Sequence, residues 1–111
     1  SDSARKLKDE SESLLAQIKP DDFVVLFDER GKALNSIDFS KRINQIQISG
    51  KKRALFVIGG AYGVSEELRK RSDMQLSLAP FVLNHWVAQI VALEQIYRGL
   101  AILKNLPYHN S

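Results

Sequence analysis

The sequence predicts an α/β fold in which helices cover a largely parallel sheet. Stretches with helical spacing alternate with short apolar runs in the order helix, strand, helix, strand, helix, strand, helix, which is typical of this fold class. The run 23–27 (FVVLF) is apolar without alternation, as in a strand that is covered on both faces. A chain of 111 residues is long enough to bury a core, and we expect a single domain over residues 1–111.

Composition narrows the class of protein. Hydrophobic residues make up 44% and charged residues 26%, as in ordinary globular proteins, and no apolar run is long enough to cross a bilayer. The chain has no cysteine, which excludes disulfides and thiolate metal sites and fits a reducing compartment. We therefore expect a cytoplasmic protein without a membrane partner. The net charge of +3 permits nucleic-acid binding without requiring it.

The first half of the chain contains two helices and one strand. Residues 3–18 place Leu7, Leu14, Leu15 and Ile18 near one stripe, which predicts a helix. After the strand 23–27, the charged segment 28–32 (DERGK) predicts a turn that contains a glycine. Ser36 is the predicted N-cap of the next helix, and Gly50 is its predicted end.

The second half adds two strands and two helices. Residues 54–58 predict a second buried strand, and Ser65 can cap a helix that runs to Arg71. Residues 74–78 alternate as in a short strand. The last helix is expected from Trp86 to about Lys104, with an apolar face broad enough to suggest an oligomer interface as well as a core contact.

A glycine-rich loop, Gly59–Gly63, joins a predicted strand to a predicted helix. Its pattern matches neither the dinucleotide fingerprint nor the P-loop, so ligand binding and a simple tight turn both stay open. In parallel α/β sheets, ligands bind at the carboxyl ends of strands. The three ends predicted here lie at 27–28, 59–60 and 78–79.

The sequence lacks the residue patterns of several common types of catalytic site. The chain has two histidines, no cysteine and no HExxH sequence, so we expect no metal site. No G-x-S-x-G elbow is present. His85, at the start of a predicted helix, could cap backbone or contact a ligand.

Five segments together resemble the RlmH family, small SPOUT-class methyltransferases that methylate a pseudouridine of large-subunit (23S-type) ribosomal RNA. They are FVIGGAYG at 56–63, LSL at 76–78, His85, LEQIYRG at 93–99 and PYH at 107–109. The resemblance covers roughly residues 5–109. E-Q-x-Y-R and P-Y-H are its most specific parts.

The resemblance implies a SPOUT-type α/β fold with a C-terminal trefoil knot, here without the N-terminal strands of the family. It implies S-adenosylmethionine as cofactor, a homodimer, and ribosomal RNA or the ribosome as partner. Gly59 would admit the cofactor, whereas Gly60 and Gly63 would allow crossing segments to pack closely. Carried over by position, the cofactor-binding residues are Phe27, Gly59, Leu78, Ala79, Pro80, Phe81, Val82 and Leu83.

The resemblance also implies roles for the C-terminal residues. Tyr108 and His109 would act across the dimer as candidate catalytic residues, with His109 as a general base or an RNA contact. Arg98 and His85 would contact RNA, although Arg98 can equally pair with Glu94 one helical turn earlier.

The sequence departs from the family pattern at four positions: Ala79, Val82, Asn84 and Gln89. Gln89 stands where the family usually has an arginine, and a lost cation weakens phosphate binding. An alternative function is therefore a non-catalytic RNA-binding or ribosome-associated module of the same fold.

Overall fold

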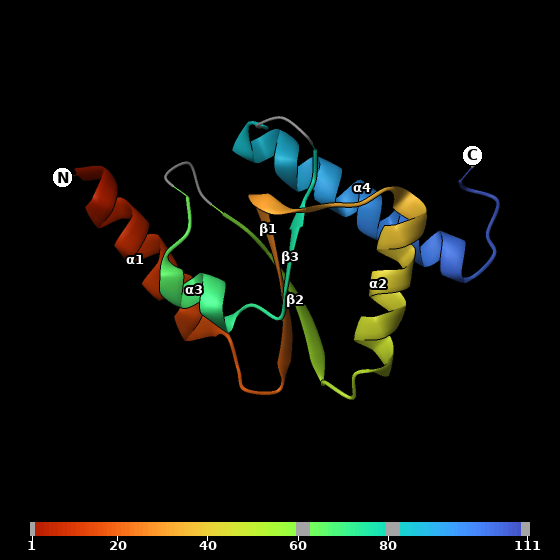
Figure 1. The fold of residues 1–111 in the computed structure, drawn as a ribbon, viewed down its shortest axis with the longest axis horizontal. Coiled ribbons are helices and arrows are strands. Elements are labelled where there is room, and N and C mark those ends of the chain that lie inside the picture. Colours follow the sequence, from red (N-terminus) through yellow and green to blue (C-terminus); the bar gives the residue numbers. More distant parts are fainter. Residues whose placement is uncertain (1, 60–62, 80–82, 110–111) are drawn as a thin grey trace.

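The computed structural model describes residues 2–59, 63–79 and 83–109. Figure 1 shows a sheet with helices on both sides. The sheet has the strand order β2-β1-β3, and both pairings are parallel. This confirms the predicted α/β class and parallel sheet. The elements in chain order are α1 (Asp2–Gln17), β1 (Asp22–Ala33), α2 (Ser36–Ile48), β2 (Arg53–Ile58), α3 (Glu66–Arg71), β3 (Met74–Ser77) and α4 (His85–Leu103).

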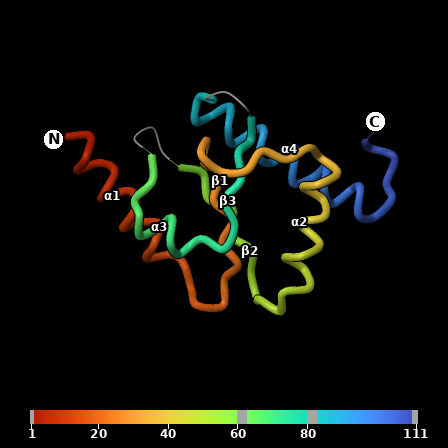
Figure 2. Tube along the Cα trace, viewed as in Figure 1, coloured from red at the N-terminus to blue at the C-terminus, as the bar shows by residue number. Residues whose placement is uncertain are grey.

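The core lies on both faces of the central strand β1. Val24 and Leu26 belong to a cluster with Val57, Val64 and Leu68, on the side of α1 and α3 (Figure 2). The alternate residues of β1 belong to a second cluster, on the side of α2 and α4, whose buried members are Val25, Phe27, Phe39, Ile43, Ile46, Leu76 and Ala92. The strand is thus covered on both faces, as its continuous apolar run predicts.

The prediction of a turn at residues 28–32 was wrong. β1 continues to Ala33, but its register with β3 shifts, because Phe27 and Lys32 both pair with Leu76. The chain therefore leaves the ladder after Phe27 and returns to it at Lys32, as an enlarged bulge does. A Cβ on Gly31 would lie 2.6 Å from the backbone N of Leu76, so this close return requires glycine.

Of the two predicted helix caps, one is shifted by one residue and the other is confirmed. Asn35, not Ser36, caps α2, and its side chain accepts a hydrogen bond of 2.8 Å from the N–H of Asp38. Asparagine and serine are equally good caps, so the sequence could not decide between these neighbours. The predicted cap Ser65 is confirmed, with its Oγ 3.1 Å from the N of Leu68. Gly50 has φ +80° after α2, as a helix-ending glycine does.

Helix α4 packs closely on α2, mainly because of one glycine. A Cβ on Gly99 would lie 2.5 Å from Cδ1 of Ile43 and 3.6 Å from Cα of Ser40. Gly99 and its neighbour Ala101 are both buried. Small residues let the two helices approach, and this packing fixes α4 across the sheet. The knot that the family resemblance implies stays a prediction, as does the single domain over residues 1–111.

Candidate functional site

A cavity of about 570 Å³ lies where the carboxyl ends of the three strands meet the start of α4. This is the edge of a parallel sheet at which ligands are expected, and the three predicted strand ends all contribute to it. Its described lining residues are Phe27, Asp28, Glu29, Ile58, Gly59, Gly63, Ser77, Leu78, Ala79, Leu83, Asn84, His85, Trp86 and Ala88.

The structure brings together most of the residues predicted to bind a cofactor. Phe27, Gly59, Leu78, Ala79 and Leu83 all line the cavity, although they come from four different segments of the chain. The other three predicted residues, Pro80, Phe81 and Val82, lie outside the described residues. The site prediction therefore has a geometric basis, while the binding role of each residue stays a prediction.

Phe27 contributes less surface than its size suggests. Its ring packs with Phe56, at 6.0 Å between centroids, and with Phe39, at 6.2 Å. Only 4% of the residue is exposed. Its carbonyl accepts a hydrogen bond of 3.4 Å from the N–H of Gly59. Phe27 therefore joins the ends of β1 and β2 and leaves little of its ring for a ligand.

The glycines beside the cavity serve two different purposes. A Cβ on Gly59 would lie 2.9 Å from Cγ1 of Val64, so Gly59 allows the returning chain to pack against the end of β2. Gly63 has φ +93°, and a Cβ there would meet nothing within 4 Å. Gly63 is therefore needed for its backbone conformation, not for the close packing that we predicted. Gly60 lies outside the described residues.

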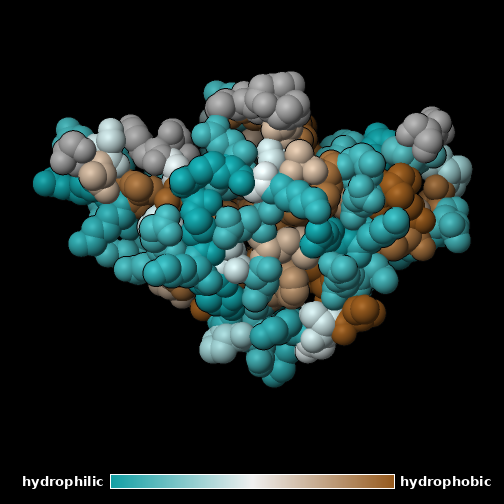
Figure 3. All heavy atoms as spheres, viewed as in Figure 1, coloured by the Kyte–Doolittle hydropathy of each residue, from teal (hydrophilic) through white to brown (hydrophobic). Residues whose placement is uncertain are grey.

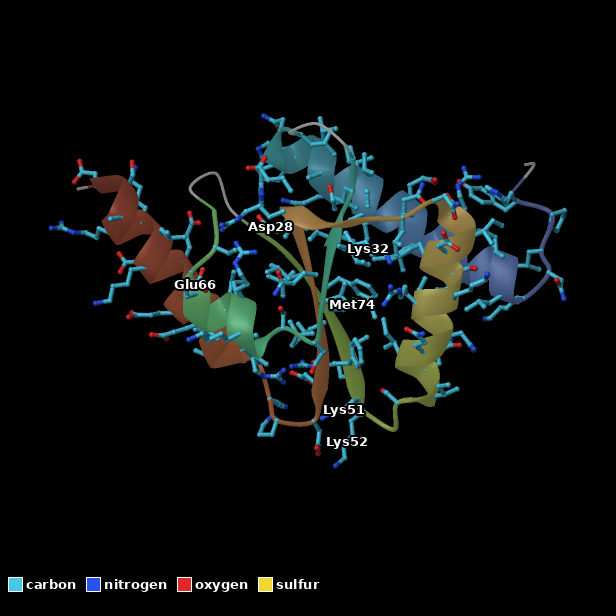
Figure 4. All side chains as sticks on the ribbon, in the orientation of Figure 1. Asp28, Lys32, Lys51, Lys52, Glu66 and Met74 are labelled. Atoms are coloured by element: carbon cyan, nitrogen blue, oxygen red, sulfur yellow. The ribbon has the colours of Figure 1, made fainter. Side chains whose placement is uncertain are left out.

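Two carboxylates in the wall, Asp28 and Glu29, were not predicted as site residues. In Figure 4, Asp28 lies at the upper end of the sheet, opposite the end that carries Lys51 and Lys52. Asp28 Oδ2 accepts a hydrogen bond of 2.8 Å from Nη1 of Arg69, and both side chains are largely buried. The useful signal was their position directly after a buried strand, which the interpretation as a turn obscured.

His85 lies at the first turn of α4 and in the cavity wall. Its Nδ1 is buried and has no hydrogen-bond partner among the residues that the structure describes. Asn84, not His85, caps the helix, and its Oδ1 accepts a hydrogen bond of 2.9 Å from the N–H of Trp86. A buried ring nitrogen without a partner costs free energy, so its place in the wall favours the ligand-contact interpretation of His85.

The C-terminal residues gather around Arg98. Its Nε lies 2.8 Å from Oε1 of Glu94, its guanidinium carbon lies 4.8 Å from the ring centroid of Tyr108, and its Nη1 lies 2.9 Å from Nδ1 of His109. The hydrogen bond with Glu94 raises the pKa of Arg98 above its ordinary value. The predicted ion pair of Arg98 is thus confirmed, and its RNA contact stays a prediction.

His109 does not line the first cavity. It lines a second one of about 520 Å³, which shares Phe27, Ser77 and Leu78 with the first. The two cavities therefore share a wall formed by Phe27, Ser77 and Leu78. The strand ends border the cavity on one side of this wall, and His109 borders the cavity on the other side. Action of Tyr108 and His109 across a dimer stays a prediction.

The exposed side of α4 is entirely apolar or aromatic. Its exposed residues, with their exposed fractions, are Trp86 (72%), Val87 (45%), Ile90 (68%), Leu93 (69%) and Tyr97 (54%). In Figure 3, hydrophobic residues reach the visible surface near α2 and the C-terminal end of α4. Contiguous apolar surface of this kind marks interaction sites.

Two further properties describe the residues at 2–59, 63–79 and 83–109. No helix there is long and apolar enough to cross a membrane. No group of three or more His, Cys, Asp or Glu side chains there could hold a metal ion.

Comparison with known proteins agrees with this geometry. Residues 1–109 match the family described as "Predicted SPOUT methyltransferase". The chain is 57% identical over 105 residues to a protein of Bdellovibrio bacteriovorus, covering 95% of this chain and 67% of that protein. It is 46% identical over 101 residues to a protein of Christiangramia forsetii, covering 91% of this chain and 64% of that protein.

Both relatives are named "Ribosomal RNA large subunit methyltransferase H", and the chain spans about two thirds of their length. The resemblance drawn from the glycine loop and the C-terminal motifs is thereby confirmed. The chain belongs to the SPOUT methyltransferase family.

Proposed function

We propose that the protein is a methyltransferase that uses S-adenosylmethionine to methylate a ring nitrogen of a pseudouridine in large-subunit ribosomal RNA. The observation that carries this proposal is the cavity at the carboxyl ends of the three strands. The names of the relatives support ribosomal RNA as the substrate class. The same proposal includes a knotted chain around the cavity, a homodimer and a cytoplasmic location.

The described residues fit this cofactor. A volume of about 570 Å³ falls within the usual range of ligand pockets, about 300–1,000 Å³. Ile58, Leu78 and Leu83 supply apolar surface for an adenine ring, and the strand ends supply backbone polar groups. The buried Nδ1 of His85 has no partner in the described part of the chain. When bound, the cofactor supplies a methyl group on a positively charged sulfur.

The chain must also manage a proton, because the imide nitrogen of the base loses its hydrogen on methylation. Arg98 has only N–H donors, so the contact at 2.9 Å makes Nδ1 of His109 the acceptor. The hydrogen of a neutral imidazole then sits on Nε2. In this tautomer the role that we propose for His109 is to stabilise negative charge that develops on the base.

A second copy of this chain is the proposed occupant of the exposed side of α4. The exposed apolar residues there would lose contact with water in a dimer. The tail residues Tyr108 and His109 lie five and six residues after the end of this helix. A dimer through α4 would therefore bring each tail close to the interface, in reach of the other copy.

Titration calorimetry with S-adenosylmethionine tests the cofactor, and transfer of radiolabelled methyl groups tests the reaction. The RNA should come from a strain whose large-subunit RNA lacks the pseudouridine methylation. We expect binding, and labelling that depends on His109. Absence of binding at millimolar cofactor would refute the proposal. Binding without labelling would favour the non-catalytic RNA-binding module instead.

A further inference from the structure

We propose that the carboxylates of Asp28 and Glu29 make the cavity selective for a cationic ligand, and so favour S-adenosylmethionine over its demethylated product. The inference rests on the proposed function and deepens it. We call these two residues the acidic wall. Both line the cavity at the end of β1's regular pairing.

The charge of the lining is opposite to that of the whole chain. The chain has a net charge of +3. In the described lining, by contrast, Asp28 and Glu29 are the residues charged at neutral pH, and neither Lys nor Arg is present. A cleft lined by one sign of charge attracts ligands of the other sign. The acidic wall therefore suits a cation.

Asp28 is held in a fixed orientation. Arg69 donates from Nη1 to Oδ2 of Asp28 at 2.8 Å and to Oε1 of Gln75 at 3.3 Å. The side chains of Arg69 and Asp28 are only 14% and 11% exposed. Arg69 is not part of the described lining, and no hydrogen bond from the described residues reaches Oδ1 of Asp28. One oxygen is thus occupied and the other remains for a ligand.

Glu29 adds a charge that no neighbour neutralises. It is exposed and forms no ion pair within the described part of the chain. The nearby cation Arg30 lies 3.7 Å from Asp28 Oδ2, and its side chain is 67% exposed, so water screens much of its field. Arg69 offsets the charge of Asp28 at 2.8 Å, so Glu29 supplies the negative charge of the acidic wall that no described side chain offsets.

Methyl transfer changes the net charge of the cofactor on which the acidic wall acts. S-adenosylmethionine carries an ammonium, a sulfonium and a carboxylate, which gives one net positive charge. Transfer would break the S–CH₃ bond with its electron pair left on sulfur and form an N–CH₃ bond, and the proton of the base nitrogen would pass to water. S-adenosylhomocysteine is then a neutral zwitterion. The acidic wall attracts it less and so favours its exchange for fresh cofactor.

The test is calorimetric and does not depend on activity. Dissociation constants for S-adenosylmethionine and S-adenosylhomocysteine are measured for the wild type, Asp28→Asn, Glu29→Gln and the double variant. In the double variant we expect the constant for S-adenosylmethionine to rise about tenfold and that for S-adenosylhomocysteine to change less than about twofold. Asp21→Asn, with the same charge change at the opposite end of β1, should alter neither.

The variants are chosen so that folding does not decide the result. Asparagine at 28 keeps an oxygen for Arg69 but removes the charge that balances this largely buried cation, so thermal unfolding of each variant is measured beside its binding. Glu29 is exposed, so thermal unfolding of Glu29→Gln should match the wild type, and this variant carries the test if Asp28→Asn is unstable. Equal changes for both ligands, or none, in variants that bind S-adenosylhomocysteine would overturn the inference and leave the proposed function standing. A wild type that binds neither ligand would overturn both.

Discussion

Arg98 lies over the ring of Tyr108, with its guanidinium carbon 4.8 Å from the ring centroid. The same side chain contacts Glu94 and His109. A planar guanidinium can serve three partners in different directions, whereas a lysine ammonium is a compact point charge. Arg98 therefore orders the C-terminal tail through its shape as well as its charge.

We predict that Arg98→Lys lowers the rate of methyl transfer at least tenfold and leaves the dissociation constant of the cofactor unchanged. The charge is kept, but the contacts that place Tyr108 and His109 are lost. Radiolabelled methyl transfer and calorimetry measure the two quantities. Arg5→Lys, on exposed α1, is the matched control. An unchanged transfer rate would remove Arg98 from the proposed site.

The packing of Gly99 against Ile43 predicts a specific stability defect. Gly99→Ala places a Cβ within 2.5 Å of Cδ1 of Ile43, and overpacking of this kind costs about 1–3 kcal/mol in free energy of unfolding. Urea unfolding measures the change. Ile43→Val removes the clashing Cδ1. The free energy of unfolding lost in the double variant should therefore be smaller than the sum of the losses in the two single variants. Simple additivity would show that the two residues do not compete for space.

Asp22 predicts how stability depends on acid. Its carboxylate accepts hydrogen bonds from Arg53 at 2.9 and 2.7 Å and from the N–H of Lys19 at 2.7 Å. These bonds, that of Arg53 first, lower the pKa of Asp22 from 3.8 to about 2. A lowered pKa stabilises the folded state above the unfolded pKa, and this stabilisation is lost as the pH falls through the folded one.

The wild type should therefore lose this contribution between about pH 4 and pH 2. Asp22→Asn should be less stable than the wild type at pH 7, and the difference should shrink over that interval. Urea unfolding at a series of pH values measures it. Asp21→Asn, at the exposed neighbour, should follow the wild-type curve. A difference between Asp22→Asn and the wild type that does not vary with pH would contradict the prediction.

The apolar side of α4 predicts a change in oligomeric state. Leu93 is 69% exposed, and Leu93→Asp would place a charge in the centre of the proposed dimer interface. We expect the wild type to sediment as a dimer and the variant as a monomer in analytical ultracentrifugation. Ile48→Asp makes the same change at a residue that is 74% exposed on α2, and it should leave the dimer intact. A monomeric wild type would refute the interface.

The sequence predicted the parts of the fold that depend on local pattern. The strands at 23–27 and 54–58 and the cap Ser65 depend on neighbours within a few residues, and the structure confirms them. The prediction that 54–58 is a buried strand was wrong, because β2 lies at the edge of the described sheet and only Val57 in it is buried. The strand-end rule also located the cavity, because parallel strands share one carboxyl edge.

Other parts depend on distant contacts and could not be predicted. Residues 28–33 stay in the sheet because they pair with Leu76 and Ser77, and no local pattern contains that pairing. Asp28 and Glu29 follow directly after the run 23–27, and they were missed because their segment was interpreted as a turn. Arg98 and His109 are eleven residues apart in the sequence, and the end of α4 lies between them. Their contact depends on how the tail folds back onto the helix.

Phe27 and Lys32 both pair with Leu76, and this has a consequence for how the site can evolve. The segment between them begins and ends in the central strand, so its conformational entropy is lost when the sheet forms and not when a ligand arrives. The exposed side chains of Glu29 and Arg30 can therefore vary with little disturbance to the sheet. A change in segment length would either resize the bulge or shift residues 32–33 by one position, which would turn their side chains to the opposite face. The chemistry of this wall can therefore change more easily by substitution at Glu29 than by insertion or deletion.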